Sequence, residues 1–337
     1  MEFNPLKYIT AKRLANIVKV ILSYQISNLL KKPVVWGMPV SYSIEPTNHC
    51  NLKCPECPSG LGTLTRPLGL LSFEKFKEIV DQIKDTGFYI QLYFQGEPFI
   101  NKNLFSMIEY AAKNKIYTSI STNGILLNAE KVDKILKSSP DKLIFSIDGL
   151  DEETYQNYRY GGTFADAEKG LKLLLEEKKK RKLKKPFVEF QFIVMKQNEH
   201  QIEQVKIYGK KIGVDKVTLK TMQITSDENA EYFLPENPEY SRYKKVNGKW
   251  IIKNKLKNRC FALWRTSVIT WDGRVVPCCF DKDAKYEVGK LNGTGIKSVW
   301  KNENFLLFRK QILKNRKSID ICRNCTEGMK INIFEIE

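Results

Sequence analysis

Six apolar, β-rich segments alternate with segments of helical period between residues 40 and 220, and this alternation constrains the fold more than any other feature. The expected strands are residues 41–45, 89–94, 117–121, 143–147, 187–194 and 216–220. The expected helices are residues 73–84, 104–113, 129–136, 165–180 and 202–212, and Ser72 and Asn128 are suitable N-caps. Such βα units predict a parallel sheet with helices outside it. Because a closed barrel has eight units, we expect an α/β fold built on an open, partial (β/α)6 TIM-like barrel.

A cysteine loop directly follows the first expected strand. Cys50, Cys54 and Cys57 have the spacing C-x3-C-x2-C. A [4Fe–4S] cluster is normally held by four cysteines, so three thiolates on one loop would leave one iron without a protein ligand. An open iron can bind a substrate or a second cofactor. Ligands of open parallel sheets collect at the carboxyl ends of the strands, so we expect this loop to carry chemistry.

Five further cysteines lie from residue 260 onward, and they can supply a second metal site. The candidate ligands are Cys260, Cys278, Cys322 and Cys325. Zinc and an iron–sulfur cluster use the same thiolate ligands, and the first cysteine loop favours iron–sulfur. Cys278 follows Pro277 after an expected hairpin, so Cys279 is the spare thiol, either a small apolar residue or an alternative ligand.

Four regions are expected along the chain. Residues 1–39 would be an N-terminal helical extension, 40–223 the barrel core, 224–259 a connector and 260–337 a small iron–sulfur domain. The connector shows no clear period between residues 227 and 243. In the last region, Asp272-Gly273 suggests a hairpin turn, and residues 298–312 have helix-like spacing.

The formal net charge of +18 raises the question of an anionic partner. Residues 178–185 read Lys-Lys-Lys-Arg-Lys-Leu-Lys-Lys, which suits either nucleic acid or anionic lipid, or a solvated helix end. No aromatic residue interleaves this run, so we favour the helix end and expect no nucleic acid partner.

Residues 11–32 predict a basic amphipathic helix. Such a helix can rest on a membrane surface, but it more often packs on its own domain, and we expect the second arrangement. No apolar run approaches the roughly 20 residues needed to cross a bilayer. Because eight cysteines are too few for a disulfide scaffold here and no signal peptide is evident, we expect a cytoplasmic protein.

The cysteine loop and the ends of the next strands resemble the radical S-adenosylmethionine (SAM) superfamily. Gln95-Gly96-Glu97-Pro98 follows the second strand, Ser121-Thr122-Asn123-Gly124 ends the third, and Ser146-Ile147-Asp148-Gly149 ends the fourth. The resemblance implies that SAM is bound by Gly96, Glu97, Pro98, Ser121, Asn123, Ser146, Asp148 and Arg159. Glu56 stands where the family usually has an aromatic residue, and Gln95 stands where it usually has glycine.

The C-terminal region resembles the SPASM domain, or its single-cluster relative called twitch, and implies one auxiliary [4Fe–4S] cluster. The resemblance further implies reductive cleavage of SAM to a 5′-deoxyadenosyl radical, which abstracts hydrogen from a substrate while the auxiliary cluster takes up an electron. The substrate would be a peptide, a protein or a small molecule, and the electron donor a flavodoxin or ferredoxin. A non-catalytic iron–sulfur or zinc module for electron transfer or partner binding is the alternative, but it would not need the motifs of residues 95–98, 121–124 and 146–149.

The alternation of side chains along a strand predicts which residues face the barrel interior. Glu189 and Gln191 alternate with Phe190 and Phe192, so the two pairs point to opposite faces of the strand. We expect the phenylalanines to pack against the outer helices and the polar pair to face the interior, either toward substrate or simply bonded to other polar groups. The same reasoning applies to Gln91, Tyr93 and Gln95.

Overall fold

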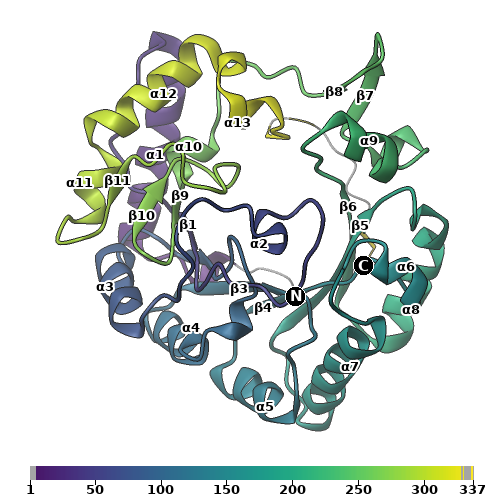
Figure 1. Cartoon of the computed structure of the whole chain (residues 1–337). Helices are drawn as coiled ribbons and strands as arrows, with labels where there is room; N and C mark the ends of the chain where they lie inside the picture. The colour runs from purple at the N-terminus through teal and green to yellow at the C-terminus, as the bar shows by residue number, and fades with distance from the viewer. Residues whose placement is uncertain (1–4, 328, 330–334, 337) are drawn as a thin grey trace. The chain divides into compact units, whose positions relative to one another are not determined.

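The computed structural model describes residues 5–327, 329 and 335–336. The chain forms two compact units, each assembled from separate stretches of sequence (Figure 1). Unit 1 comprises residues 5–49, 64–119 and 255–327 of the described chain, and unit 2 comprises residues 50–63 and 120–254 with the described residues that follow 328. Unit 1 therefore combines the two ends of the described chain, while unit 2 combines the middle of the chain with the cysteine loop of residues 50–63.

Unit 1 is built on a sheet that joins strands from both ends of the chain. Its strands are β1 (Ser41–Ile44), β2 (Tyr89–Gln91), the start of β3 (Tyr117–Thr122), β9 (Thr266–Ile269), β10 (Arg274–Val276) and β11 (Gly289–Lys290). β1 pairs in parallel with β2 on one side and with β9 on the other, and β2 pairs in parallel with β3. β9, β10 and β11 continue as an antiparallel meander. The C-terminal hairpin thus extends the sheet of the βα units.

The helices of unit 1 pack on this sheet through apolar faces or, in one case, a polar face. They are α1 (Ala11–Leu30), α3 (Phe73–Ile83), α4 (Leu104–Lys113), α10 (Ala262–Arg265), α11 (Ile296–Trp300), α12 (Glu303–Asn315) and α13 (Asp320–Arg323), with 3-10 turns at Pro5–Lys7, Pro98–Ile100 and Arg316–Ser318. Helix α3 begins at Ser72, whose hydroxyl accepts a hydrogen bond from the Lys75 amide, and it buries Phe76, Ile79 and Val80.

Unit 2 carries three parallel strands, and the helices α7 and α8 lie along their outer side (Figure 1). The strands are β4 (Lys142–Ser146), β5 (Phe187–Val194) and β6 (Lys216–Thr221), with the short β12 (Glu335–Ile336) antiparallel to β6 and a separate hairpin of β7 (Tyr243–Val246) and β8 (Lys249–Ile252). The helices are α2 (Pro58–Leu61), α5 (Ala129–Ser138), α6 (Glu152–Gln156), α7 (Phe164–Lys180), α8 (Ile202–Ile212) and α9 (Asp227–Phe233), with 3-10 turns at Glu199–Gln201 and Pro238–Tyr240.

The expected βα units are present, and one expectation outside them needs correction. The region expected to be a connector holds a capped helix, α9, and the β7–β8 hairpin, neither of which the sequence predicted. The helix expected over residues 298–312 is instead two helices, because Asn302 caps the start of α12 and ends the continuity with α11. The hairpin turn at Asp272-Gly273 is confirmed, and Gly273 adopts the positive φ of +85° that such a turn requires.

Helix α1 packs on unit 1, but not through its apolar residues. The buried positions are Arg13, Asn16, Val20, Ser23 and Ser27, whereas the four leucines, Val18 and Ile21 are exposed. Hydrophobic periodicity therefore identifies the helix correctly but assigns the wrong face to the protein interior. Within the described residues, no helix is long and apolar enough to cross a membrane.

Candidate functional site

The cysteine loop of unit 2 is a compact turn followed at once by helix α2. The Cys57 amide donates to the Cys54 carbonyl over 3.1 Å, and the Lys53 amide donates to the Tyr160 carbonyl over 2.8 Å. A Cβ on Gly60 would lie 2.6 Å from the Cys54 nitrogen, so only glycine lets α2 lie this close to the loop. The loop geometry thus depends on contacts with α2 and with residue 160.

The three thiols sit at the edge of an apolar cluster. Cys54 is buried, Cys50 and Cys57 are half-buried, and all three pack with Leu52 and Tyr158. Burial raises the pKa of the Cys54 thiol, and the Arg159 guanidinium opposes that shift. A dry, apolar surround that leaves thiols partly accessible suits a bound cluster, whose potential depends on solvent exposure.

A buried ion pair between Arg159 and Asp148 contacts the cysteine loop at Cys54. Arg159 donates from Nε and Nη2 to Asp148 Oδ2 over 2.6 and 2.5 Å, and its Nη1 lies 3.9 Å from Cys54 Sγ. Asp148 is fully buried, and its second oxygen accepts the Ile193 amide over 2.6 Å. Burial alone would lower the pKa of Arg159, but Asp148 and Cys54 outweigh burial and raise it. The structure therefore presents a fixed positive charge to the cysteine loop.

Other expected SAM residues of unit 2 gather in short hydrogen-bonded groups. Asn123 Nδ2 donates to Asn51 Oδ1 over 2.9 Å, which links the end of β3 to the cysteine loop. Ser121 and Ser146 place their hydroxyls 3.3 Å apart, and Gln191 Nε2 donates to the Ser146 hydroxyl over 3.4 Å. These hydrogen bonds join residues that are far apart in the sequence. They bring together the carboxyl ends of β3 and β4, as expected for neighbouring parallel strands.

Along β5, polar and aromatic side chains alternate as expected. Phe190 and Phe192 are fully buried, while Glu189 pairs with Lys142 over 2.5 Å on the neighbouring strand. Both polar residues of the pair, Glu189 and Gln191, thus have polar partners on β4. This pattern matches the alternative in which polar groups bond one another.

In unit 1, Gly96, Glu97 and Pro98 form a tight bend after β2. Gly96 has a φ of +74°, and a Cβ there would lie 2.5 Å from the His49 carbonyl oxygen. That same carbonyl accepts the Glu97 amide over 2.7 Å. The Glu97 carboxylate accepts the Phe99 amide over 3.2 Å and is almost fully buried. Both the backbone conformation and the close approach require glycine at position 96.

The second cysteine group is assembled entirely within unit 1. Cys260 precedes α10, Cys278 follows β10, Cys322 lies in α13 and Cys325 follows it. Cys260, Cys322 and Cys325 are buried, Cys278 is half-buried and Cys279 is exposed. Burial raises the pKa of Cys260 to about 12 and that of Cys322 to about 11. Apolar burial of this kind keeps a thiol protonated unless a metal centre takes its proton.

Arg316 is a contact that sequence reasoning missed. Its Nη2 lies 3.1 Å from Cys325 Sγ, and the residue is 2% exposed. Cys260, Cys325 and Cys322 raise the pKa of Arg316 against the opposing effect of burial. An arginine at the start of a 3-10 turn carries no sequence signal that would place it among cysteines.

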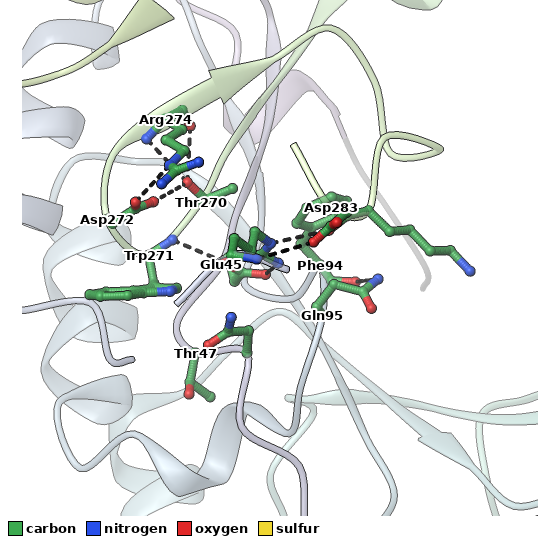
Figure 2. A network of polar contacts seen from close by, with 12 residues as sticks. Glu45, Thr47, Phe94, Gln95, Thr270, Trp271, Asp272, Arg274 and Asp283 are labelled. Atoms are coloured by element: carbon green, nitrogen blue, oxygen red, sulfur yellow. Dashed lines mark hydrogen bonds and ion pairs between the residues drawn. The ribbon is translucent and has the colours of Figure 1, made fainter. Parts of the chain in front are cut away.

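A network of polar contacts joins the end of strand β1 to the turn between β9 and β10 (Figure 2). Glu45, fully buried just after β1, forms a two-pronged pair with Arg66 over 2.5 and 2.6 Å and accepts the Trp271 amide over 3.1 Å. Figure 2 also shows the turn closed by Thr270, Asp272 and Arg274. Asp283, in the loop after β10, accepts the Thr65 amide over 2.7 Å, so residues 65 and 66 contact both β1 and that loop.

Glu56 has a structural role that the sequence does not reveal. Its carboxylate accepts hydrogen bonds from Thr225 Oγ1 over 2.9 Å and from Asn229 Nδ2 over 2.5 Å. Asn229 belongs to helix α9. Glu56, which stands where the family usually has an aromatic residue, therefore connects the cysteine loop to α9.

The donor sets fit iron–sulfur cubanes. Among the described residues, no three His, Cys, Asp or Glu side chains converge as ligands of a single metal ion. One zinc ion needs its ligands to converge on it, whereas a cubane places each cysteine on a different iron atom. Four thiolates can serve either group, whereas a loop of three thiolates suits a cubane with one open iron.

Comparison with known proteins identifies the chain. Residues 44–206 match the radical SAM superfamily, and residues 260–326 match the SPASM iron–sulfur cluster-binding domain. The chain is a radical SAM enzyme with a C-terminal SPASM domain. The expectation of an enzyme is thereby confirmed over that of a non-catalytic module. The cofactors of this radical SAM enzyme are a SAM-binding [4Fe–4S] cluster and one or more iron–sulfur clusters bound by the SPASM domain.

Two relatives match more than three quarters of the chain. A Pyrococcus furiosus protein, the tungsten-containing aldehyde ferredoxin oxidoreductase cofactor-modifying protein, is 26% identical in an alignment that covers 79% of this chain and 82% of that protein. The antilisterial bacteriocin subtilosin biosynthesis protein AlbA of Bacillus subtilis is 24% identical over 78% of this chain, which spans only 60% of AlbA. Peptides and small molecules are substrates typical of such maturases.

A solved structure confirms the fold class. Streptococcus suis SuiB, solved with its precursor peptide SuiA, superposes with a TM-score of 0.63 at 17% identity, covering 95% of this chain and 76% of SuiB. The radical SAM enzyme therefore has the mixed α/β fold, with the parallel sheet of a partial barrel and a C-terminal SPASM region.

Proposed function

We propose that this radical SAM enzyme oxidises its substrate, using the loop of Cys50, Cys54 and Cys57 to hold the SAM-binding cluster. When bound there, the cluster supplies one electron for reductive cleavage of SAM, whose 5′-deoxyadenosyl group removes a hydrogen atom from the substrate. The observation that carries the proposal is the three-thiol loop itself, packed against an apolar cluster with Arg159 at 3.9 Å from Cys54. Three thiols leave one iron open for SAM.

The protein residues around this loop bind and orient rather than react. Asp148 fixes the guanidinium of Arg159, and Asn123 fixes Asn51 beside Cys50. Apolar side chains of the same cluster, including Leu52, shield the buried Cys54 from water. We assign SAM binding to Gly96, Glu97, Pro98, Ser121, Asn123, Ser146, Asp148 and Arg159 on the strength of the motifs.

We assign one auxiliary [4Fe–4S] cluster to Cys260, Cys278, Cys322 and Cys325, with an electron-accepting role. One observation supports Cys278 over Cys279: Cys278 is half-buried, whereas Cys279 is exposed. Four thiolates would fill the cluster's iron positions, so such a cluster would accept an electron rather than bind substrate. Net oxidation of the substrate follows from that uptake.

A peptide or a small molecule remains the substrate class. The names of AlbA and SuiB's partner SuiA support a peptide, and the cofactor-modifying relative supports a small molecule. A flavodoxin or ferredoxin would deliver the first electron. We place the enzyme in the cytoplasm, where thiols stay reduced.

The test is anaerobic reconstitution followed by iron analysis and assay of 5′-deoxyadenosine. The intact chain should hold about eight irons, as two cubanes imply. Replacing Cys50, Cys54 and Cys57 with Ala should halve the iron and abolish 5′-deoxyadenosine, whereas full activity of that variant would refute the proposal.

A second pair of variants tests the auxiliary site. Cys322→Ala should keep SAM cleavage and lose net turnover, and Cys279→Ala should change neither. Loss of the second cluster in Cys279→Ala would show that the ligand assignment is wrong, and unchanged product yield in Cys322→Ala would refute the electron-accepting role.

A further inference from the structure

Helix α1 is fastened to unit 1 by its polar face. The Arg13 side chain is almost fully buried and donates to the carbonyl groups of Tyr8, Lys84, Asn114 and Lys115 over 2.5 to 3.1 Å. Lys84 and Asn114 are the C-caps of α3 and α4, so one guanidinium satisfies the carbonyl ends of two helices. The orientation of α1 about its own axis is therefore fixed.

Serine and asparagine side chains continue this attachment along the helix. Asn16 exchanges two hydrogen bonds with the Met38 backbone, at 2.9 and 2.8 Å. Ser23 accepts the Trp36 amide over 2.9 Å, and Ser27 accepts the Val34 amide over 2.8 Å. The chain after α1 runs back along the same face, so polar residues hold the helix along most of its length.

The opposite face of α1 is apolar and exposed. Leu14, Val18, Ile21, Leu22 and Leu29 recur at helical spacing and are 53%, 47%, 43%, 47% and 81% exposed. We call these five residues the outer face of α1. Leu30, the last residue of the helix, is also exposed, at 56%. A contiguous apolar patch of this kind marks an interaction site rather than ordinary surface.

The charge around the outer face selects its partner. Residues 3–44 contain no Asp or Glu, and Lys19, Lys31 and Lys32 lie on the helix or follow it, whereas Lys12 pairs with Asp85 over 3.0 Å. A second copy of this chain would bring those lysines against one another, which disfavours self-association. An anionic bilayer offers negative headgroups to the lysines and an apolar boundary to the leucines.

We propose that the outer face of α1 rests on an anionic phospholipid surface. The helix would lie in the plane of the interface, attached to the enzyme through Arg13 and exposed to lipid through Leu14, Val18 and Leu22. The cytoplasmic leaflet carries the required negative charge. This binding is independent of the chemistry proposed above and gives the enzyme a location at the membrane surface.

Flotation of the full, reconstituted chain with vesicles tests the proposal. Vesicles of equal parts phosphatidylcholine and phosphatidylglycerol should carry the protein upward, and pure phosphatidylcholine vesicles should carry much less. Added salt should weaken the binding, because it screens the lysines. Leu22→Glu should lower the bound fraction about tenfold by placing a charge in the apolar boundary.

Ile207→Glu is the matched control, because Ile207 is 69% exposed on helix α8, outside the outer face. It should bind vesicles as the unaltered chain does. Both variants should form 5′-deoxyadenosine at the unaltered rate, which shows that they fold. No flotation of the unaltered chain, or equal flotation of Leu22→Glu, would overturn the proposal. A dimer in solution that Leu22→Glu dissociates would also overturn it, in favour of a second copy.

Discussion

Replacing Asp148 with Asn tests the buried ion pair under the cysteine loop. Asp148 and Arg159 have side-chain exposures of 0% and 12%, and their closest contact is 2.5 Å. Removing one partner of a buried pair costs about 3–5 kcal/mol, because the remaining charge is left unpaired. Cys54 Sγ lies 3.9 Å from Arg159 Nη1 and compensates part of the loss, so we expect the lower end of that range.

A loss of about 3 kcal/mol lowers Tm by about 6–12 °C in a unit of this size. The measurement is thermal unfolding under anaerobic conditions, at one scan rate for all variants because Fe–S proteins unfold irreversibly. Glu130→Gln is the control, since it breaks the exposed Glu130–Lys134 pair and should shift Tm by only about 1 °C. Equal Tm values for Asp148→Asn and Glu130→Gln would refute the reasoning.

Two further substitutions probe the two cofactor sites. Gly96→Ala should abolish 5′-deoxyadenosine formation while iron content stays unchanged, because a Cβ at position 96 would lie 2.5 Å from the His49 carbonyl oxygen. Retained SAM cleavage would contradict the assigned role of this bend. Arg316→Gln should make the reduction potential of the auxiliary cluster more negative, because it removes a positive charge 3.1 Å from Cys325 Sγ. A redox titration followed by electron paramagnetic resonance (EPR) measures the shift, and an unchanged potential would contradict the contact.

Local sequence patterns predict most of the βα units. β5 and α8 begin and end at the expected residues, and Ser72 and Asn128 cap their helices as expected. These features are encoded within a few residues of where they form, by period and by capping side chains. The pairing of β9 with β1 is not readable in this way, because it joins residues from opposite ends of the chain.

The face that α1 buries shows the limit of hydrophobic periodicity. The pattern identifies residues that share a face, but it does not say which face meets the protein. The deciding contacts are backbone carbonyls, such as those of Lys84 and Asn114, which Arg13 reaches across about seventy or more residues of sequence. Backbone carbonyls have no side-chain signature, so no pattern reveals them.

In the candidate site too, some residues are predictable from the sequence and others are not. Cys50, Cys54 and Cys57 are recognisable because cluster ligands close in sequence stay close in space. The residues around the two cysteine groups are not recognisable in this way. Glu56, in the first group, bonds to Asn229, and Arg316 contacts Cys325 of the second group. Nothing in the local sequence of Glu56 or Arg316 predicts its partner.

The most direct test of the account is EPR of a Cys322→Ala, Cys325→Ala chain, which should hold only the cluster of the Cys50 loop. After anaerobic reduction, the account predicts a [4Fe–4S] signal that changes when SAM is added, because SAM binds the open iron. A signal that SAM leaves unchanged would contradict the central claim, as would a reduced chain without a cubane signal.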